Sequence, residues 1–232
     1  VAMAGHSLGE YTALVCSGAL DFATAVDLVR FRGQVMQQAV PLGQGAMAAV
    51  LGLDDELVAE ACREAEQGEV VEPVNFNSPG QVVIAGNATA VARAIEAAQA
   101  RGAKRAVTLP VSVPSHSRLM MGAAERLAER LAGVDVRMPD VPAIYTVDVK
   151  THASPDGIRL ALKEQLHKPV RWAETVRAML ASGVTTIVEC GPGKVLTALN
   201  KRIERRPGLT MLAVEDPDGL AAALAACKGG AA

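Results

Sequence analysis

The sequence has few aromatic residues, little net charge and no long apolar run. Its 232 residues include three Phe, two Tyr and one Trp, too few for the stacking platforms that bind single-stranded nucleic acid. The net charge of -2 gives no general attraction to a phosphate backbone. No apolar stretch reaches the roughly 20 residues that a membrane-spanning helix needs. We therefore expect a soluble protein that acts on small substrates rather than polymers and binds neither nucleic acid nor a membrane.

Cysteine and histidine are also sparse, and their spacing is not that of a metal site or a disulfide scaffold. No two of the four cysteines form a C-x-x-C pair, and the four histidines form no H-E-x-x-H motif. The cysteines are Cys16, Cys62, Cys190 and Cys227. We expect no metal ion, no bound cofactor and no disulfide, and a location in the reducing cytoplasm.

A serine between two glycines is the most informative motif. Gly5-His6-Ser7-Leu8-Gly9 follows a strand-like run and precedes a helix-compatible stretch, as in the nucleophile elbow, a sharp turn that projects a serine into a cleft. A side chain at either glycine is expected to collide with the neighbouring strand or helix. Because N–H groups at a helix start can stabilise an oxyanion, the motif predicts serine acyl chemistry.

The next predicted helix carries two arginines of interest. Asp21 is expected to cap a helix that runs to about Val40, and Pro41 ends it. Arg30 and Arg32 fall on opposite flanks of its apolar stripe, so either could reach a cleft at the edge. Helical periodicity does not choose between them, and the plain reading of each is a solvated surface arginine.

Residues 43–113 change to short elements in the order β-α-β-β-α-β, which is typical of a ferredoxin-like domain. The predicted strands are 46–53, 70–76, 81–85 and 105–111, and the predicted helices are 54–66 and 88–100. Asn77-Ser78-Pro79-Gly80 is expected to turn the central hairpin. This segment therefore has the pattern of an inserted small domain.

Helices and strands alternate on both sides of that insert, which indicates a mostly parallel sheet covered on both faces. Strands are predicted at 143–147 and 185–189, and helices at 119–131, 156–166, 172–182 and after Lys194. The predicted fold class is α/β, with an α/β-hydrolase-like parallel-sheet core (1–42 and 114–232) and a ferredoxin-like α+β insert (43–113).

A serine nucleophile needs a base, and four histidines are available. His6 neighbours Ser7, but neighbours on a tight turn project apart, so His6 is expected to pack beside the elbow. His152 and His167 lie in expected loops. His116 follows two prolines just before a predicted helix, and that rigidity suits a base that must stay within hydrogen-bond reach of a hydroxyl. The pattern favours His116 without excluding the others.

Five motifs occur along the chain in a fixed order. They are Gly5-His6-Ser7-Leu8-Gly9-Glu10, Phe31-Arg32-Gly33, Val74-Asn75-Phe76-Asn77-Ser78-Pro79-Gly80-Gln81, Val113-Pro114-Ser115-His116 and Gly191-Pro192-Gly193-Lys194-Val195-Leu196. Together they resemble the malonyl-CoA:acyl-carrier-protein transacylases of bacterial type II fatty-acid synthesis. The resemblance covers nearly the whole chain with family-like spacing.

This resemblance implies a role for each matched residue. Ser7 would be the nucleophile that takes the malonyl group from coenzyme A, and His116 the base that activates it and later the carrier-protein thiol. Arg32, rather than Arg30, would pair with the free malonyl carboxylate, for which bidentate geometry suits arginine. Gln165 would orient the histidine through its backbone carbonyl in place of a triad aspartate, with its side chain facing the malonyl group.

The oxyanion site implied by the resemblance is only partly present. The backbone N–H of Leu8 would be one donor, but the family's Gly-Gln-Gly-Ser-Gln segment, which supplies the other donor and the first strand, is absent from the sequence. The chain opens on Val1 without an initiator methionine, so we expect a segment to precede it. Losing one donor costs on the order of a hundred- to a thousand-fold in rate, and we expect this chain alone to be impaired or unstable.

The implied partners are malonyl-CoA and acyl carrier protein. Carrier proteins are acidic, so a basic docking surface is expected. Its candidates are Lys104 with Arg105 and Lys201 with Arg202, although each pair alone also reads as ordinary solvated charge.

Three further features have plainer interpretations. Asn75 and Asn77 are expected to be turn residues first and coenzyme A contacts second, and His6 is a further candidate contact. The run 191–194 lacks the full phosphate-loop pattern, so we interpret it as a strand-to-helix turn.

Two other functions share some of these features. An α/β-hydrolase esterase or thioesterase has the same elbow, but it needs an acid between the serine and the histidine in chain order, and none is evident near the cleft. A docking module that binds carrier protein without turnover would have no use for Ser7 and His116. The leading hypothesis is ping-pong acyl transfer through a seryl ester, without a metal or bound cofactor.

Overall fold

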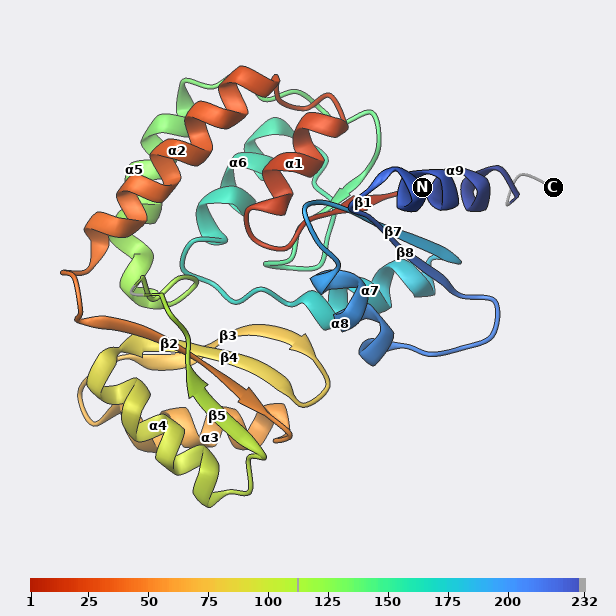
Figure 1. The fold of residues 1–232 in the computed structure, drawn as a ribbon. Coiled ribbons are helices and arrows are strands. Elements are labelled where there is room, and N and C mark those ends of the chain that lie inside the picture. The colour runs from red at the N-terminus through yellow and green to blue at the C-terminus, as the bar shows by residue number, and fades with distance from the viewer. Residues whose placement is uncertain (112, 230–232) are drawn as a thin grey trace. The chain divides into compact units, whose positions relative to one another are not determined.

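The computed structural model describes residues 1–111 and 113–229, so residue 112, just before the predicted base segment, lies outside it. The described residues form an α/β protein with several small sheets (Figure 1). They divide into a first unit, up to Thr175, and a second unit that begins at Val176. Within the described ranges, no helix combines the length and the apolar character needed to cross a bilayer.

Helices and a short parallel sheet place the elbow in the first unit. Strand β1 (Met3–Ala4) pairs in parallel with β6 (Ala143–Ile144). The helices are α1 (Gly9–Cys16), α2 (Phe22–Ala39), α5 (Met121–Ala132) and α6 (Pro155–Glu164), with a 3-10 turn, η1 (Arg118–Met120), before α5. Figure 1 shows α2 beside α5. Apolar residues of all four helices and of the chain after β6 share one buried core.

Local sequence explains where α2 begins. The Asp21 carboxylate accepts a hydrogen bond from the Thr24 N–H at 2.9 Å, which satisfies one of the free donors at a helix start. The predicted N-cap is therefore confirmed. The cap fixes where α2 begins and therefore which of its residues lie on the inner face. Leu28 and Val35 are among those that are buried.

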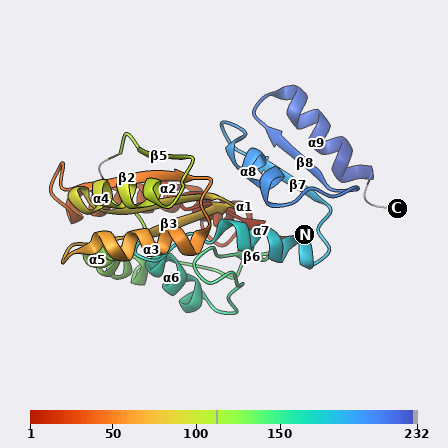
Figure 2. The same ribbon diagram turned by 90° about the horizontal axis from the view of Figure 1, so that it is seen from below.

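The segment after α2 forms a second, separate core. The elements are β2 (Gly45–Leu51), α3 (Asp55–Glu66), β3 (Val71–Ser78), β4 (Gln81–Asn87), α4 (Ala88–Ala100) and β5 (Arg105–Thr108). The strands are all antiparallel and lie in the order β3-β4-β2-β5. Figures 1 and 2 show α3 and α4 side by side across this sheet. The buried apolar cluster between them comes entirely from this segment, and the predicted β-α-β-β-α-β order is present.

The second unit is smaller. Helix α7 (Trp172–Ala181) crosses the division between the units, and the second unit then contains β7 (Thr186–Cys190), α8 (Val195–Ile203), β8 (Thr210–Val214) and α9 (Pro217–Gly229). Strands β7 and β8 pair in parallel. The run 191–194 joins β7 to α8, so its interpretation as a strand-to-helix turn is confirmed.

Some expectations about the fold are corrected. The parallel strands form two separate two-stranded sheets instead of one larger sheet. Strand β6 stops short of the predicted 143–147 because the chain turns back, with the Tyr145 N–H bonded to the Lys150 carbonyl and the Val149 N–H to the Tyr145 carbonyl, each at 2.9 Å. The hairpin turn is only Pro79-Gly80, since β3 continues to Ser78. Sequence patterns also missed β8 and the alanine-rich α9.

Only the first glycine of the elbow is required for close packing. A Cβ atom at Gly5 would lie 1.9 Å from the Gly9 carbonyl carbon and 2.1 Å from the Glu10 nitrogen. A Cβ atom at Gly9 would meet nothing within 4 Å. The expectation of crowding at both glycines is therefore wrong for Gly9, because the close approach is between the backbone at residue 5 and the start of α1.

This difference can be measured as stability. We expect Gly5→Ala to lower the free energy of unfolding by about 3 kcal/mol or more, because backbone atoms must move apart. The matched variant Gly9→Ala should be neutral or stabilising by up to about 1 kcal/mol, since alanine is the better helix former. Urea unfolding of both variants tests this, and equal effects would contradict it.

Candidate active site

Ser7 lies on a strained turn between β1 and α1. Its φ of 53° is in the left-handed region, which costs a non-glycine residue free energy and is typical of functional sites. No described carbonyl or side chain accepts a hydrogen bond from the N–H of the next residue, Leu8. That donor is therefore available beside the serine at the start of α1.

His116, which follows the β2–β5 segment in the sequence, contacts this serine. The Ser7 hydroxyl donates to His116 Nε2 at 2.8 Å. On the other side of the ring, Nδ1–H donates to the Gln165 backbone carbonyl at 2.6 Å. Since a carbonyl only accepts, this bond places the proton on Nδ1 and leaves Nε2 free to accept the serine proton.

Backbone contacts hold the imidazole in this position. His116 has a φ of 65°, and its N–H donates to the Leu166 carbonyl at 2.9 Å. Its side chain is buried. Burial, with the nearby positive charge of Arg32, lowers the pKa of His116 to about 3, although the bond to the Gln165 carbonyl opposes the shift. The imidazole is therefore a neutral base at physiological pH.

Arg32 contacts the same hydroxyl. Its Nη2 donates to Ser7 Oγ at 2.9 Å and to Gln165 Oε1 at 3.1 Å. The guanidinium carbon lies 5.9 Å from the centre of the Tyr11 ring, within the range of a cation–π contact. Its buried Nε has no hydrogen-bond partner among the described residues. Burial lowers the pKa of Arg32, so the site contains a buried cation with an unused donor.

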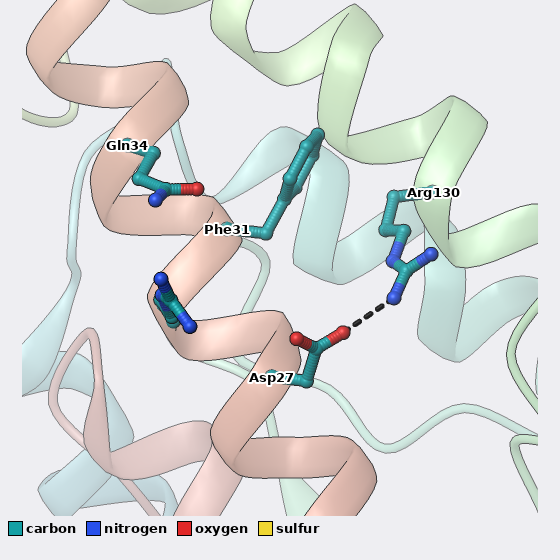
Figure 3. A pocket seen from close by; sticks show the side chains of 5 residues that line it. Asp27, Phe31, Gln34 and Arg130 are labelled. Carbon is teal, nitrogen blue, oxygen red and sulfur yellow. Dashed lines mark hydrogen bonds and ion pairs between the residues drawn. The ribbon is translucent and has the colours of Figure 1, made fainter.

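The structure distinguishes Arg32 from Arg30, which the helical periodicity of the sequence could not do. Arg32 is buried, whereas Arg30 is exposed and lines a surface hollow of about 190 Å³ on the outer side of α2 and α5. Figure 3 shows the Asp27–Arg130 ion pair across this hollow. Of the two arginines, only Arg32 contacts Ser7.

Gln165 connects the other members of the site. Besides its backbone contact with His116, its side-chain Nε2 donates to the Ser7 carbonyl at 3.0 Å and to Glu10 Oε2 at 2.6 Å. Its Oε1 accepts from Arg32. The structure thus brings Ser7, His116, Arg32 and Gln165 into one hydrogen-bonded network.

Glu10 belongs to this network, and sequence reasoning missed it. It is buried in the first turn of α1. Burial raises its pKa to about 7, while hydrogen bonds from Thr146 and Gln165 and the charge of Arg32 act in the opposite direction. A glutamate at the start of a helix ordinarily favours the helix dipole at the surface, so its sequence position alone does not indicate a buried role.

The two asparagines are strand residues, which corrects their assignment to the turn. Asn75 and Asn77 lie in β3 and are buried, because β3 continues past them to Ser78. Asn77 Oδ1 accepts from His6 Nε2 at 2.8 Å, and the His6 ring lies 5.7 Å from the Trp172 ring. His6 therefore packs beside the elbow, as predicted. The buried Asn75 Nδ2 has no partner among the described residues.

The remaining predicted residues lie outside this network. Lys104 and Arg105 are exposed at the start of β5, and Lys201 and Arg202 are exposed in α8. His152 and His167 are half-buried, more than the loop pattern suggested. Across the described ranges, no cluster of three His, Cys, Asp or Glu side chains is arranged to hold a metal ion.

Comparison with known proteins shows that this chain is similar to acyl transferases. Residues 1–213 match the family model described as acyl transferase domain. The chain is 58% identical to the malonyl CoA-acyl carrier protein transacylase of Escherichia coli K12 over 222 residues, which cover 96% of this chain and 71% of that protein. It is 48% identical to the protein of that name from Bacillus subtilis 168, covering 97% and 71% of the two chains.

Solved structures of malonyl transferases are also similar to this chain. An acyl carrier protein S-malonyltransferase from Vibrio cholerae matches with a TM-score of 0.91 and 57% identity, covering 94% of this chain and 71% of that one. A malonyl-transacylase solved in complex with its type II PKS acyl-carrier protein matches with a TM-score of 0.94 and 53% identity, covering 97% and 72%.

The low pKa of His116 predicts how Ser7 reactivity depends on pH. A neutral sulfonyl fluoride should modify Ser7 with a rate that changes less than about two-fold between pH 6 and 5, because His116, with a pKa of about 3, stays unprotonated throughout. A base with the ordinary histidine pKa near 6.5 would lose about ten-fold over this range. The rate of inactivation, measured at each pH, tests this prediction. Ser7→Ala is the control for reaction at other groups.

Proposed function

The chain belongs to the malonyl-CoA:acyl-carrier-protein transacylases, and we propose that Ser7 carries the malonyl group as an ester. Its activity is malonyl transfer from coenzyme A to acyl carrier protein in fatty-acid synthesis. The observation that supports the residue roles best is the position of Ser7 Oγ, 2.8 Å from His116 Nε2 and 2.9 Å from Arg32 Nη2. A base and a cation contact one hydroxyl.

In the first half-reaction, His116 Nε2 takes the hydroxyl proton as Ser7 Oγ bonds to the thioester carbonyl carbon. The Leu8 N–H stabilises the oxyanion. The carbon–sulfur bond then breaks, and the imidazolium returns its proton to the departing thiolate of coenzyme A. The products are free coenzyme A and malonyl-Ser7.

The second half-reaction reverses these roles. The phosphopantetheine thiol of acyl carrier protein gives its proton to His116, and its sulfur bonds to the ester carbonyl carbon as the bond to Ser7 Oγ breaks. Ser7 recovers its proton from the imidazolium. An esterase triad would place a carboxylate on His116 Nδ1, whereas here the neutral Gln165 carbonyl lies there at 2.6 Å.

Arg32 accounts for the preference for a dicarboxylic acyl group. A malonyl carboxylate is only one methylene away from the ester carbonyl, so a guanidinium that contacts Ser7 Oγ is within its reach. The carboxylate would also satisfy the buried Arg32 Nε, which has no partner among the described residues. Acetyl leaves that donor unpaired, which is costly in a dry site. Gln165 bonds to Arg32 and His6 bonds to Asn77. We propose Gln165, His6, Asn75 and Asn77 as further substrate contacts.

The finer architecture is also a proposal. The antiparallel order β3-β4-β2-β5 and an apolar cluster drawn only from this segment support a ferredoxin-like insert at 43–113. The parallel pairs and the elbow support an α/β-hydrolase-like core formed by 1–42 and 114–232. The four free cysteines are consistent with a cytoplasmic location.

Intact mass spectrometry tests the residue roles. After brief exposure to malonyl-CoA, the parent chain should gain one malonyl group, and Ser7→Ala should gain none. Arg32→Ala should lose at least about ten-fold in the rate of malonyl labelling, because a charged hydrogen-bond partner is removed, while acetyl labelling from acetyl-CoA changes much less. An unchanged ratio of malonyl to acetyl labelling would remove Arg32 from the acyl-recognition site.

We also propose that two exposed basic pairs dock the acidic carrier protein. The candidates are Lys104 with Arg105 and Lys201 with Arg202. Lys201 also lines a hollow of about 510 Å³ together with Arg205 and Arg206, which increases the local positive charge.

Charge reversal tests this docking. Replacing both pairs by glutamate should raise the apparent KM for carrier protein about three-fold or more at low salt, because exposed charges steer association. The KM for malonyl-CoA should not change. Reversal of four other exposed arginines, Arg63, Arg126, Arg137 and Arg177, provides a control with the same change in net charge. An equal effect there would argue against a specific surface.

A further inference from the structure

Glu10 is the buried carboxylate next to the catalytic network. It is 2% exposed. Its Oε1 accepts from the Thr146 N–H at 2.8 Å and from the Thr146 hydroxyl at 2.6 Å, and its Oε2 accepts from Gln165 Nε2 at 2.6 Å. Both carboxylate oxygens therefore have partners, but neither bonds to His116 or to Ser7.

These contacts decide which way the Gln165 amide points. A carboxylate only accepts hydrogen bonds, so it must face the amide NH2 group of Gln165. The amide oxygen then faces the opposite way, toward Arg32 Nη2 at 3.1 Å. If the amide were reversed, its NH2 group would face the guanidinium, and two donors would be opposed.

We propose that Glu10 is a positioning residue for malonyl recognition: its carboxylate orients the Gln165 side chain, and the Gln165 oxygen holds the Arg32 guanidinium beside Ser7. The inference rests on the proposed role of Arg32 as the partner of the malonyl carboxylate. The same amide nitrogen also donates to the Ser7 carbonyl at 3.0 Å, so the orientation that serves Arg32 also braces the elbow.

Glu10 supplies a counter-charge without occupying Arg32. A buried arginine needs a nearby negative charge, yet a carboxylate bonded directly to the guanidinium would compete with the substrate. One intervening amide avoids that competition. The charged and titratable groups coupled to Glu10 are Arg32 from α2, Tyr11 from α1 and Tyr145 after β6.

Glu10→Gln removes the charge while keeping the shape. The Thr146 N–H is part of the backbone and cannot reverse, so the new amide oxygen will stay on Thr146 and the new NH2 group will face Gln165. The Gln165 amide then either keeps its place on the Ser7 carbonyl with two NH2 groups opposed, or turns over, so that Arg32 loses its acceptor. Both outcomes weaken the hold on Arg32. We expect kcat/KM for malonyl-CoA to fall about ten-fold or more, as for a lost charged hydrogen bond. The value for acetyl-CoA should fall several-fold less, because only the contact with the Ser7 carbonyl affects it.

The matched control is Glu129→Gln, an exposed glutamate on α5, which should change neither value. A merely structural role for Glu10, tying α1 to Thr146, would lower both activities together with the unfolding temperature. An equal loss with both thioesters would therefore overturn the inference.

A double-mutant cycle tests whether Glu10 acts through Gln165. Gln165→Met keeps the side-chain length and the backbone carbonyl that bonds to His116. In that background, Glu10→Gln should have little further effect on the ratio of malonyl to acetyl kcat/KM; full additivity would contradict the proposal. Arg32→Ala distinguishes a failure of the proposed role of Arg32 from a failure of the inference about Glu10. If Arg32→Ala loses malonyl preference and Glu10→Gln keeps it, only the inference about Glu10 fails.

The unmodified chain provides a test that does not depend on a variant folding. Because the pKa of Glu10 is raised to about 7, the carboxylate is charged above that pH and neutral below it. Malonyl preference over acetyl should fall several-fold from pH 8 to pH 6 and recover on return to pH 8. A preference that is constant over this range would overturn the proposal, and Glu10→Gln, if folded, should show a constant low preference.

Discussion

Gln165 is the residue on which the arrangement of the site depends. Its backbone carbonyl holds the His116 ring at 2.6 Å, its side-chain oxygen holds Arg32, and its side-chain nitrogen reaches the Ser7 carbonyl. Three groups from distant parts of the chain therefore share one reference point. Any movement of the segment around Gln165 would shift base, cation and nucleophile together.

The use of a peptide carbonyl beside the imidazole fits the charge balance of the site. Arg32 contributes one buried positive charge, and Glu10 contributes one negative charge above its pKa of about 7. A triad carboxylate would add a second negative charge where the malonyl carboxylate is proposed to bind. A neutral carbonyl fixes the tautomer without that repulsion. The cost is weaker support for the imidazolium, which in the proposed reaction favours passing the proton from His116 to the leaving thiolate.

Sequence reasoning predicted the elements with strong local signals. The elbow, the Asp21 cap and the β-α-β-β-α-β order each follow from short-range chemistry. The distinction between Arg30 and Arg32 was not accessible in that way, because a helical wheel places both at the stripe edge and only tertiary packing buries one. Glu10 was missed for a similar reason: its partners Thr146 and Gln165 are 136 and 155 residues away, and no periodicity records such contacts.

Ser7 and His116 share a left-handed backbone, with φ of 53° and 65°. For residues with a side chain this conformation costs roughly 1–2 kcal/mol each, and glycine adopts it freely. Gln67 and Val149 share this conformation, so glycine would relieve strain at four described positions. Only at Ser7 and His116 would it also remove a side chain to which we assign a chemical role. A selection for heat resistance alone does not distinguish these positions, so it needs a parallel assay of turnover.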